Sequence, residues 1–69
     1  MRMYSVDSKM IREIGHDGKL TLRVVFSNGA TWEYDGVSTQ AFDAMRQAES
    51  VGRYFHAHIK NAYQGRKVE

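Results

Sequence analysis

Three basic side chains near the C-terminal end are spaced so that they share one face of a helix. Arg53, His56 and Lys60 are three and four residues apart. Arg66 and Lys67 follow shortly after them. A row of cations binds phosphates with a sequence-independent affinity that falls as salt is added. The alternative interpretation is an ordinary solvated helix face.

The charge of the chain is unevenly distributed. Residues 1–49 carry six basic and seven acidic side chains, whereas residues 50–69 carry four basic and one acidic side chain. The C-terminal part is therefore the basic pole of a protein whose formal net charge is only +2. This asymmetry suits an anionic partner such as RNA or another nucleic acid.

Aromatic side chains offer a second way to hold a nucleic acid, because exposed rings stack on bases. Trp32 and Tyr34 are two residues apart, so they share one face of a strand. The strand register given below turns both rings into the core, and we expect them to pack there. Tyr54 lies beside the basic row, so it is the aromatic side chain that we expect to contact a ligand.

No group of residues has the spacing that catalysis or metal binding needs. His56 and His58 point about 200° apart on a helix, and no cysteine is present to complete a zinc site. Ser50 is better explained as a helix cap, and Asp35 and Asp43 as turn and helix-surface residues. We therefore expect a protein that is not an enzyme, with no metal and no cofactor.

Gly52 has a structural and a functional interpretation. In the first, only a residue without a side chain fits where a second helix starts tightly against the first. In the second, the exposed start of that helix attracts a phosphate, with Arg53 beside it. The structural interpretation is the favoured one.

Length and composition limit the architecture to one small domain. The chain has 69 residues, enough for a single core. It has no cysteine, which suits a reducing compartment, and no apolar run long enough for a signal peptide or a membrane span. We expect a cytoplasmic protein that does not contact membranes.

Two hairpin turns, Asp17-Gly18 and Asn28-Gly29, predict a three-stranded antiparallel sheet. The turn at Asn28-Gly29 decides the register of the second and third strands. A two-residue turn would bury Glu33 and Asp35, whereas a three-residue loop would not, so we predict the loop, with Gly29 in the left-handed conformation. The predicted partners are Phe26 with Ala30, Val24 with Trp32, Leu22 with Tyr34, and Arg23 with Glu33. Even-numbered residues from 20 to 34 then form one apolar face.

The ends of the chain and the first strand are less regular. Ile11 and Ile14 are three residues apart and cannot both point inward from a regular strand, so we expect either a bulge between them or an irregular start before Ile14. Residues 1–7 are predicted to be a flexible lead-in and residues 65–69 a flexible basic tail. The single domain is expected to span residues 8–64.

Two helices are predicted to follow the sheet and to pack on one of its faces, which makes the fold class α+β. Ser38 caps the first helix, which runs to about Ala48. Ser50 caps the second, which runs to about Tyr63. The predicted inward residues are Ala41, Phe42, Ala44, Met45 and Ala48 in the first helix, and Val51, Phe55, Ile59 and Ala62 in the second.

The order of these elements resembles the KTSC domain, a family named after a C-terminal segment of some lysyl-tRNA synthetases. The similarity spans about Ser8 to Tyr63. It rests on Phe26-Ser27-Asn28-Gly29, Trp32-Glu33-Tyr34-Asp35-Gly36-Val37, and the run from Ala48 to Tyr63 that begins Ala48-Glu49-Ser50-Val51-Gly52. The sequence departs from the family pattern at Trp32 and His16, where tyrosine is usual. The resemblance implies a small stand-alone bacterial or phage protein, with RNA binding as the suggested function.

The residues and the resemblance together predict a non-catalytic binding module that holds RNA weakly, mainly through phosphates. The alternative is a protein-interaction or self-associating domain of a small phage or bacterial accessory protein, a monomer or weak dimer that uses a sheet edge or the wet sheet face. The nucleic-acid-binding residues expected are Arg53, Tyr54, His56, Lys60, Arg66 and Lys67.

Overall fold

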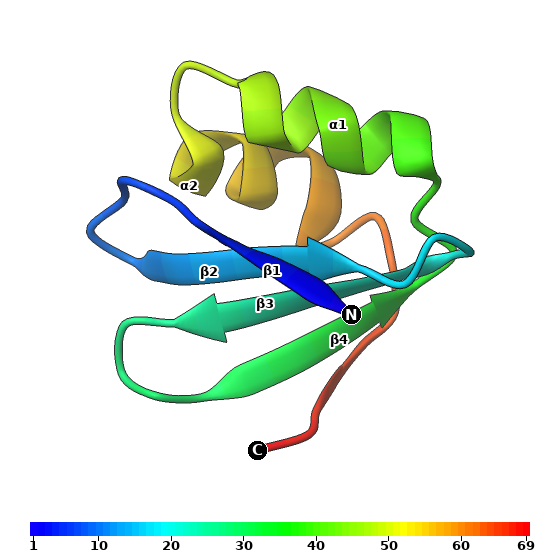
Figure 1. Ribbon diagram of the computed structural model, residues 1–69, viewed down its shortest axis with the longest axis horizontal. Coiled ribbons are helices and arrows are strands. Elements are labelled where there is room, and N and C mark those ends of the chain that lie inside the picture. Colours follow the sequence, from blue (N-terminus) through cyan, green and yellow to red (C-terminus); the bar gives the residue numbers. More distant parts are fainter.

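A five-stranded antiparallel sheet carries all the helices on one of its faces (Figure 1). The computed structural model describes residues 1–69. The strands follow one another in the order β1-β2-β3-β4-β5 without a crossover. The elements are β1 (Arg2–Ser5), β2 (Ile11–His16), β3 (Thr21–Phe26), β4 (Thr31–Asp35), α1 (Thr39–Gln47), α2 (Val51–Tyr54), the π-helix η1 (Phe55–Ile59) and β5 (Gly65–Lys67).

The register between β3 and β4 confirms the three-residue loop. Gly29 has a φ of 92°, and Asn28 accepts a hydrogen bond from the Ala30 N–H at 2.9 Å. Leu22 faces Tyr34, Val24 faces Trp32 and Arg23 faces Glu33. The predicted apolar face is wrong only at Leu20, which is 56% exposed because it lies in the turn before β3.

The bulge expected in β2 is present between Ile11 and Glu13, where the pairing with β3 shifts by one residue. Because of this shift, Ile11 and Ile14 both point towards the helices and are fully buried. The bulge therefore adds one more apolar side chain to the core of this small domain.

The flexible lead-in predicted for residues 1–7 is corrected by the structure. Arg2–Ser5 form β1, which pairs with β2 so that Tyr4 faces Ile14. The Tyr4 ring packs near Phe42 and lies under the Arg46 guanidinium, whose carbon is 3.8 Å from the ring centre. These contacts offset the entropy of ordering the segment, and four residues are too few to reveal a strand by alternation alone.

The flexible tail predicted for residues 65–69 is corrected as well. Gly65–Lys67 form β5, in which Arg66 pairs with Glu33 of β4. The Arg66 guanidinium donates to Glu33 at 3.0 Å and to Asp35 at 2.5 Å. The sheet therefore has five strands where three were predicted, because both outer strands depend on contacts with residues far away in the sequence.

The two serine caps are confirmed. Ser38 accepts from the Ala41 N–H at 3.1 Å, and Ser50 accepts from the Arg53 N–H at 3.2 Å. The second helix ends earlier than predicted, since a π-helical stretch replaces its expected continuation to Tyr63. Two alanines predicted to point inward, Ala44 and Ala62, are exposed instead.

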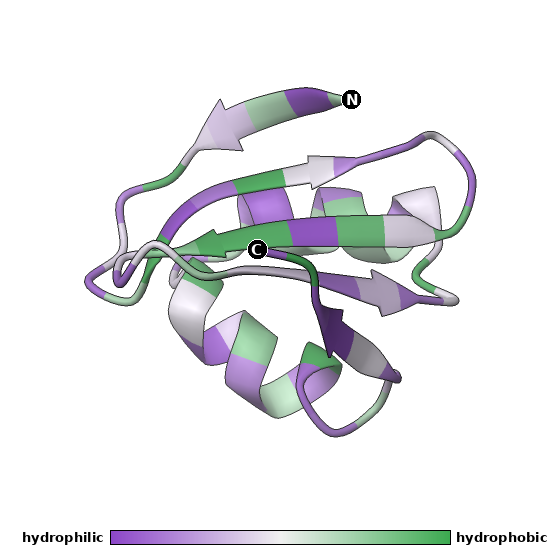
Figure 2. Cartoon of the chain, turned by 90° about the horizontal axis from the view of Figure 1, so that it is seen from below, coloured by the Kyte–Doolittle hydropathy of each residue, from purple (hydrophilic) through white to green (hydrophobic).

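The core lies between the sheet and the helices. It comprises Ile11, Ile14, Leu22, Val24, Tyr34, Val37, Phe42, Met45, Val51, Phe55 and Ile59. The opposite face of the sheet carries no helix, and Figure 2 shows polar and apolar residues alternating along its strands. No helix has the length and apolar character that crossing a bilayer requires.

Candidate functional site

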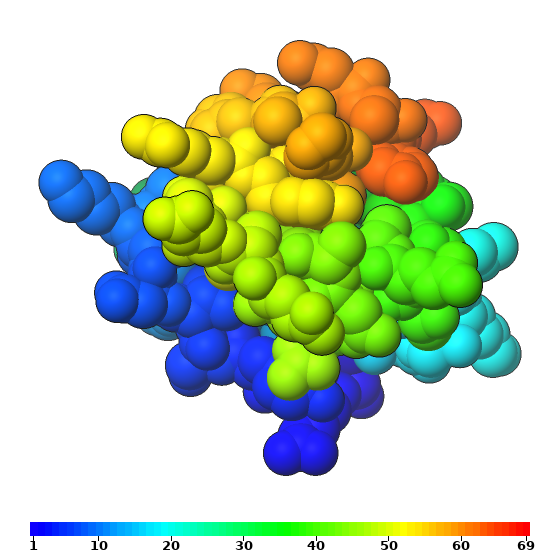
Figure 3. Space-filling model, turned by 90° about the horizontal axis from the view of Figure 1, so that it is seen from above, coloured from blue at the N-terminus to red at the C-terminus, as the bar shows by residue number.

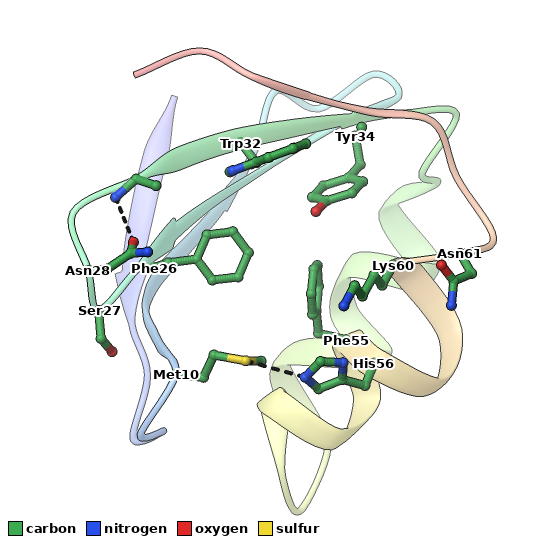
Figure 4. Close-up of a pocket in the computed structure, with 12 residues that line it drawn as sticks. Met10, Phe26, Ser27, Asn28, Trp32, Tyr34, Phe55, His56, Lys60 and Asn61 are labelled. Atoms are coloured by element: carbon green, nitrogen blue, oxygen red, sulfur yellow. Dashed lines mark hydrogen bonds between the residues drawn. The ribbon is translucent and has the colours of Figure 1, made fainter.

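A groove of about 650 Å³ lies between the sheet and the second helical segment, on the side of β4 and β5 (Figure 4). It is bounded by the β3–β4 hairpin, by η1 and by the residues that lead into β5. The lining residues are Met10, Phe26, Ser27, Asn28, Ala30, Trp32, Tyr34, Phe55, His56, Lys60, Asn61 and Gly65. Its size falls in the range of small-ligand sites.

Four aromatic rings form the walls of this groove. Trp32 and Tyr34 lie nearly parallel, 20° apart with their ring centres separated by 6.3 Å. Phe55 meets both Tyr34 and Phe26 edge to face, at 5.5 Å in each case. Tyr34 is only 5% exposed and belongs to the core, as the register predicted, whereas Trp32 is half-buried and keeps a surface in the groove.

The polar ends of two of these rings have no partner in the protein. Neither the Tyr34 hydroxyl nor the Trp32 indole N–H makes a hydrogen bond in the protein. Every side-chain nitrogen or oxygen without a partner keeps some exposed surface, so both atoms reach solvent. Figure 4 shows the Tyr34 hydroxyl directed into the groove and the indole nitrogen at the end nearer Asn28. Burial raises the pKa of the Tyr34 phenol, so the hydroxyl is neutral and able to donate at physiological pH.

Lys60 gives the groove a positive charge. Lys60 and His56 line it, and no aspartate or glutamate does. Arg12 donates to the carbonyl of Ser27, a lining residue, at 3.4 Å, which holds a guanidinium near the hairpin end. Lys67 pairs with Trp32 across β4 and β5, so its side chain leaves the sheet on the same face as the indole.

The π-helical stretch determines where Lys60 lies. The Lys60 N–H donates to the carbonyl of Phe55 at 2.9 Å, one residue further back than in an α-helix. This wider turn brings Lys60 to the side of the helix occupied by Phe55, over the groove. Figure 4 shows the Lys60 side chain reaching towards the Phe55 ring.

The six residues expected to bind nucleic acid lie on separate surfaces. His56 and Lys60 line the groove, and Lys67 lies on the face where the groove opens. Arg53 and Tyr54 line a different hollow, of about 570 Å³, at the junction of the helices. Arg66 lies on the helix-free face of the sheet, where it forms ion pairs with acidic side chains.

The wall of the second hollow contains two rings and three polar side chains. The Tyr54 and His58 rings are in contact there, with centres 4.6 Å apart, and Glu49 and Ser50 complete the wall next to Arg53. Figure 3 shows the helical face from above, on which this junction lies. No group of three histidine, aspartate or glutamate side chains is arranged to hold a metal ion anywhere in the chain.

The structural interpretation of Gly52 is right about close packing but wrong about the partner. A Cβ at this position would lie 3.2 Å from the Ser8 hydroxyl oxygen, in the segment before β2. The close neighbour is therefore the N-terminal segment, not the first helix. Because α2 is a single short turn of four residues, its start offers little as an anion site.

Sequence reasoning missed most of the groove. Phe26, Trp32, Tyr34 and Phe55 were assigned to the core by their spacing, and the alternation of a strand does not reveal which core side chains also border a cavity. The position of Arg12 gave no signal, because it depends on a contact with a loop 15 residues away.

The fold and the sequence both have relatives among known proteins. The KTSC domain profile matches residues 7–63. The crystal structure of KTSC domain protein YPO2434 from Yersinia pestis superimposes with a TM-score of 0.93 at 32% identity, covering 99% of this chain and 97% of that one. An uncharacterized protein of Stutzerimonas stutzeri is 33% identical over 61 residues, 87% of this chain and 86% of its own length. A protein of Tsukamurella paurometabola is 36% identical over 59 residues, 84% and 88% of the two chains. The chain therefore belongs to the KTSC domain family.

Proposed function

We propose that this protein is a non-catalytic module that binds single-stranded RNA, with a base in the aromatic groove and phosphates at its basic rim. The observation that carries the proposal is the combination of Trp32 and Tyr34 in the groove with Lys60 and His56 beside them. Base stacking on aromatic rings contributes about 1–3 kcal/mol per base, so a groove this small suffices for weak binding.

The charges around the groove support an anionic ligand. Lys60, after η1, lines the groove, while Arg12 in β2 contacts the carbonyl of the lining residue Ser27 and Lys67 in β5 pairs with the lining residue Trp32. Since no carboxylate lines the groove, a phosphate near it would meet no repulsion from the walls. This arrangement uses part of the basic row predicted from the sequence and replaces Arg53 and Arg66 by Arg12.

The shape of the groove favours single strands over duplexes. Its aromatic floor includes Tyr34, which is almost fully buried, so a base must leave a stack to reach it. A paired base pays an extra cost of unpairing and unstacking of a few kcal/mol. A cytoplasmic location is part of the proposal and is supported by the absence of cysteine.

Fluorescence anisotropy with labelled octanucleotides tests the proposal. We expect single-stranded RNA to bind with an affinity that falls as salt rises, and a duplex of the same sequence to bind at least tenfold more weakly. Lys60→Ala should weaken binding, whereas Lys19→Ala, at an exposed turn lysine away from the groove, should not. Equal affinity for duplex and single strand, or no binding at low salt, would refute it.

A protein partner is the second candidate, because the helix-free face of the sheet has a hollow of its own, lined half by apolar residues and half by Arg23, Thr31 and Glu69. Met3, Val25 and Val68 line a depression of about 340 Å³ there, and Val68 is 43% exposed. A second copy of the chain is the simplest occupant. Sedimentation velocity at two concentrations distinguishes this candidate, since a dimer would sediment faster at the higher concentration.

A further inference from the structure

We infer that the groove recognises a single base by its edge and prefers uracil over cytosine. The inference rests on the proposed function and deepens it. It makes the base, rather than the phosphate, the part of the ligand that sets the preference. The argument depends on which polar groups face the groove and which of them can only donate.

The first step is that polar atoms in the groove wall are unpaired. The Trp32 indole N–H and the Tyr34 hydroxyl have no hydrogen-bond partner in the protein, yet each reaches solvent. A base that covers these atoms removes their water. Unless the base supplies a partner, the lost hydrogen bond opposes binding, so the groove distinguishes one base edge from another.

The second step is that the groups with a fixed role are donors. The indole N–H of Trp32 and the ammonium of Lys60 can only donate. Asn28 already uses its carbonyl oxygen to accept from the Ala30 N–H at 2.9 Å, which leaves its amide N–H groups to donate. Figure 4 shows the Asn28 amide nitrogen on the groove side.

The third step concerns acceptors, which are scarce in the groove. No carboxylate lines it, and the Ser27 hydroxyl, which donates its proton to the carbonyl of Lys9 at 2.8 Å, leaves only its oxygen, which can accept. Tyr34 and Asn61 can adapt to either role, whereas the Nε2 of His56 already contacts the Met10 sulfur at 3.3 Å. The edge of uracil, with two carbonyl oxygens and one N–H, therefore finds more partners than the edge of cytosine, whose amino group brings two N–H groups that need acceptors.

The volume agrees with recognition of one base. About 650 Å³ exceeds the needs of a single ring system but is too small for several unstacked nucleotides. Phe26 and Phe55 border the space on the side opposite the Trp32 and Tyr34 rings (Figure 4), so a base that enters lies among aromatic faces and edges. Neighbouring nucleotides would remain outside, near the basic rim.

Uracil and cytosine provide a matched pair for the test, because they have the same shape and differ in the O4 carbonyl and the N4 amino group. Titrations of octauridylate and octacytidylate, followed by tryptophan fluorescence, should give about fivefold tighter binding of the uracil oligomer, the size of one net hydrogen bond. An abasic oligomer of the same length should bind more weakly than either.

Variants that keep the rings but remove the polar atoms identify the source of the preference. Trp32→Phe and Tyr34→Phe should each bring the ratio of the two affinities closer to one. Because Trp32→Phe removes the single tryptophan, binding by this variant is followed by the anisotropy of a labelled oligomer. Tyr54→Phe, in the second hollow, should leave the ratio unchanged. Thermal unfolding of each variant shows whether the fold is intact.

The outcomes separate the inference from the proposed function. Equal binding of the two oligomers, a preference for cytosine, or an abasic oligomer that binds as well as the others would overturn the inference and leave RNA binding in place. Failure of every oligomer to bind would overturn both. A ratio that survives both ring variants would also overturn the inference, because the preference would then come from other groups.

Discussion

Gly65 crosses the face of the Tyr34 ring so closely that a Cβ on this glycine would overlap the ring carbons. The two residues are partners across β4 and β5, and both line the groove. The backbone at Gly65, which borders the groove, therefore packs directly on the Tyr34 ring, which forms the floor of the groove. Only a residue without a side chain allows this close approach at position 65.

Gly65→Ala is expected to destabilise the protein by about 1–3 kcal/mol, because either the Tyr34 ring or β5 must move. Urea unfolding followed by circular dichroism measures the change. The neighbouring Gln64 is exposed, and Gln64→Ala serves as the control with little effect. A Gly65→Ala protein as stable as the parent would show that β5 does not press on this ring.

The Arg66 guanidinium beside Asp35 lowers the pKa of that carboxyl group. A lowered folded-state pKa means that the ion pair adds stability above the unfolded pKa of about 3.9 and loses it as the pH falls through the folded value. Arg66→Gln should therefore raise the pKa of Asp35, measured by carboxyl carbon NMR, and weaken the acid dependence of stability below about pH 4.

Asp17 provides the internal control for that titration. The pKa of this carboxyl is lowered chiefly by the backbone N–H groups of Lys19 and Thr21, which donate at 2.7 and 3.1 Å. Arg66→Gln should leave it unchanged. If Asp35 titrates identically in the parent and the variant, the ion pair seen on the sheet face does not persist in solution.

His16 connects the β2–β3 turn to the segment before α1. Its Nε2–H donates to the carbonyl of Val37 at 2.7 Å, its Nδ1 accepts from the Gly18 N–H at 3.0 Å, and its ring stacks on Phe42. His16→Ala leaves that carbonyl unpaired and should cost about 2–3 kcal/mol.

Urea unfolding measures the cost, and His58→Ala, at an exposed position, is the control. In addition, nitrogen-15 NMR should show the proton of neutral His16 on Nε2. A loss no greater than that of His58→Ala, or a proton on Nδ1, would contradict the role assigned to this histidine.

The separation of the basic residues predicts different effects on binding. Lys60→Ala should weaken single-stranded RNA binding severalfold and reduce the slope of log affinity against log salt by about 0.7, the value for one phosphate contact. Arg66→Gln should change neither quantity, because its guanidinium is held by Glu33 and Asp35 on the opposite face. Equal losses for both variants would mean that the phosphates follow the whole basic C-terminal segment.

The sequence predicted the centre of the fold but not its edges. The glycine turn at Asn28-Gly29, together with the pairing of Arg23 and Glu33, determined the β3–β4 register, because the other register would have buried acids. Strands β1 and β5 were not predicted, because each depends on contacts with residues far away in the sequence. Tyr4 of β1 contacts Arg46, and Arg66 of β5 contacts Glu33, and the local alternation of residues does not reveal such contacts.

The candidate site was predictable only in part. The basic row rested on α-helical spacing, and the π-helical stretch after Tyr54 alters that spacing at Lys60. Trp32 and Tyr34 were noticed as a pair, but both were assigned to the core, and Tyr54, which lines the second hollow, was preferred as the ring that contacts a ligand. Whether a core ring also borders a groove depends on how far the helix stands from the sheet, which no local pattern encodes.

The indole N–H resonance of Trp32 provides the most direct measurement of the central claim, because this proton reports from inside the groove. Addition of a single-stranded uracil oligomer should shift it, together with the side-chain amide signals of Asn28 and the backbone signals of Phe55 and Lys60. Shifts confined to Arg53, Tyr54 and the second hollow, or to the helix-free sheet face, with the indole signal unmoved, would contradict the account.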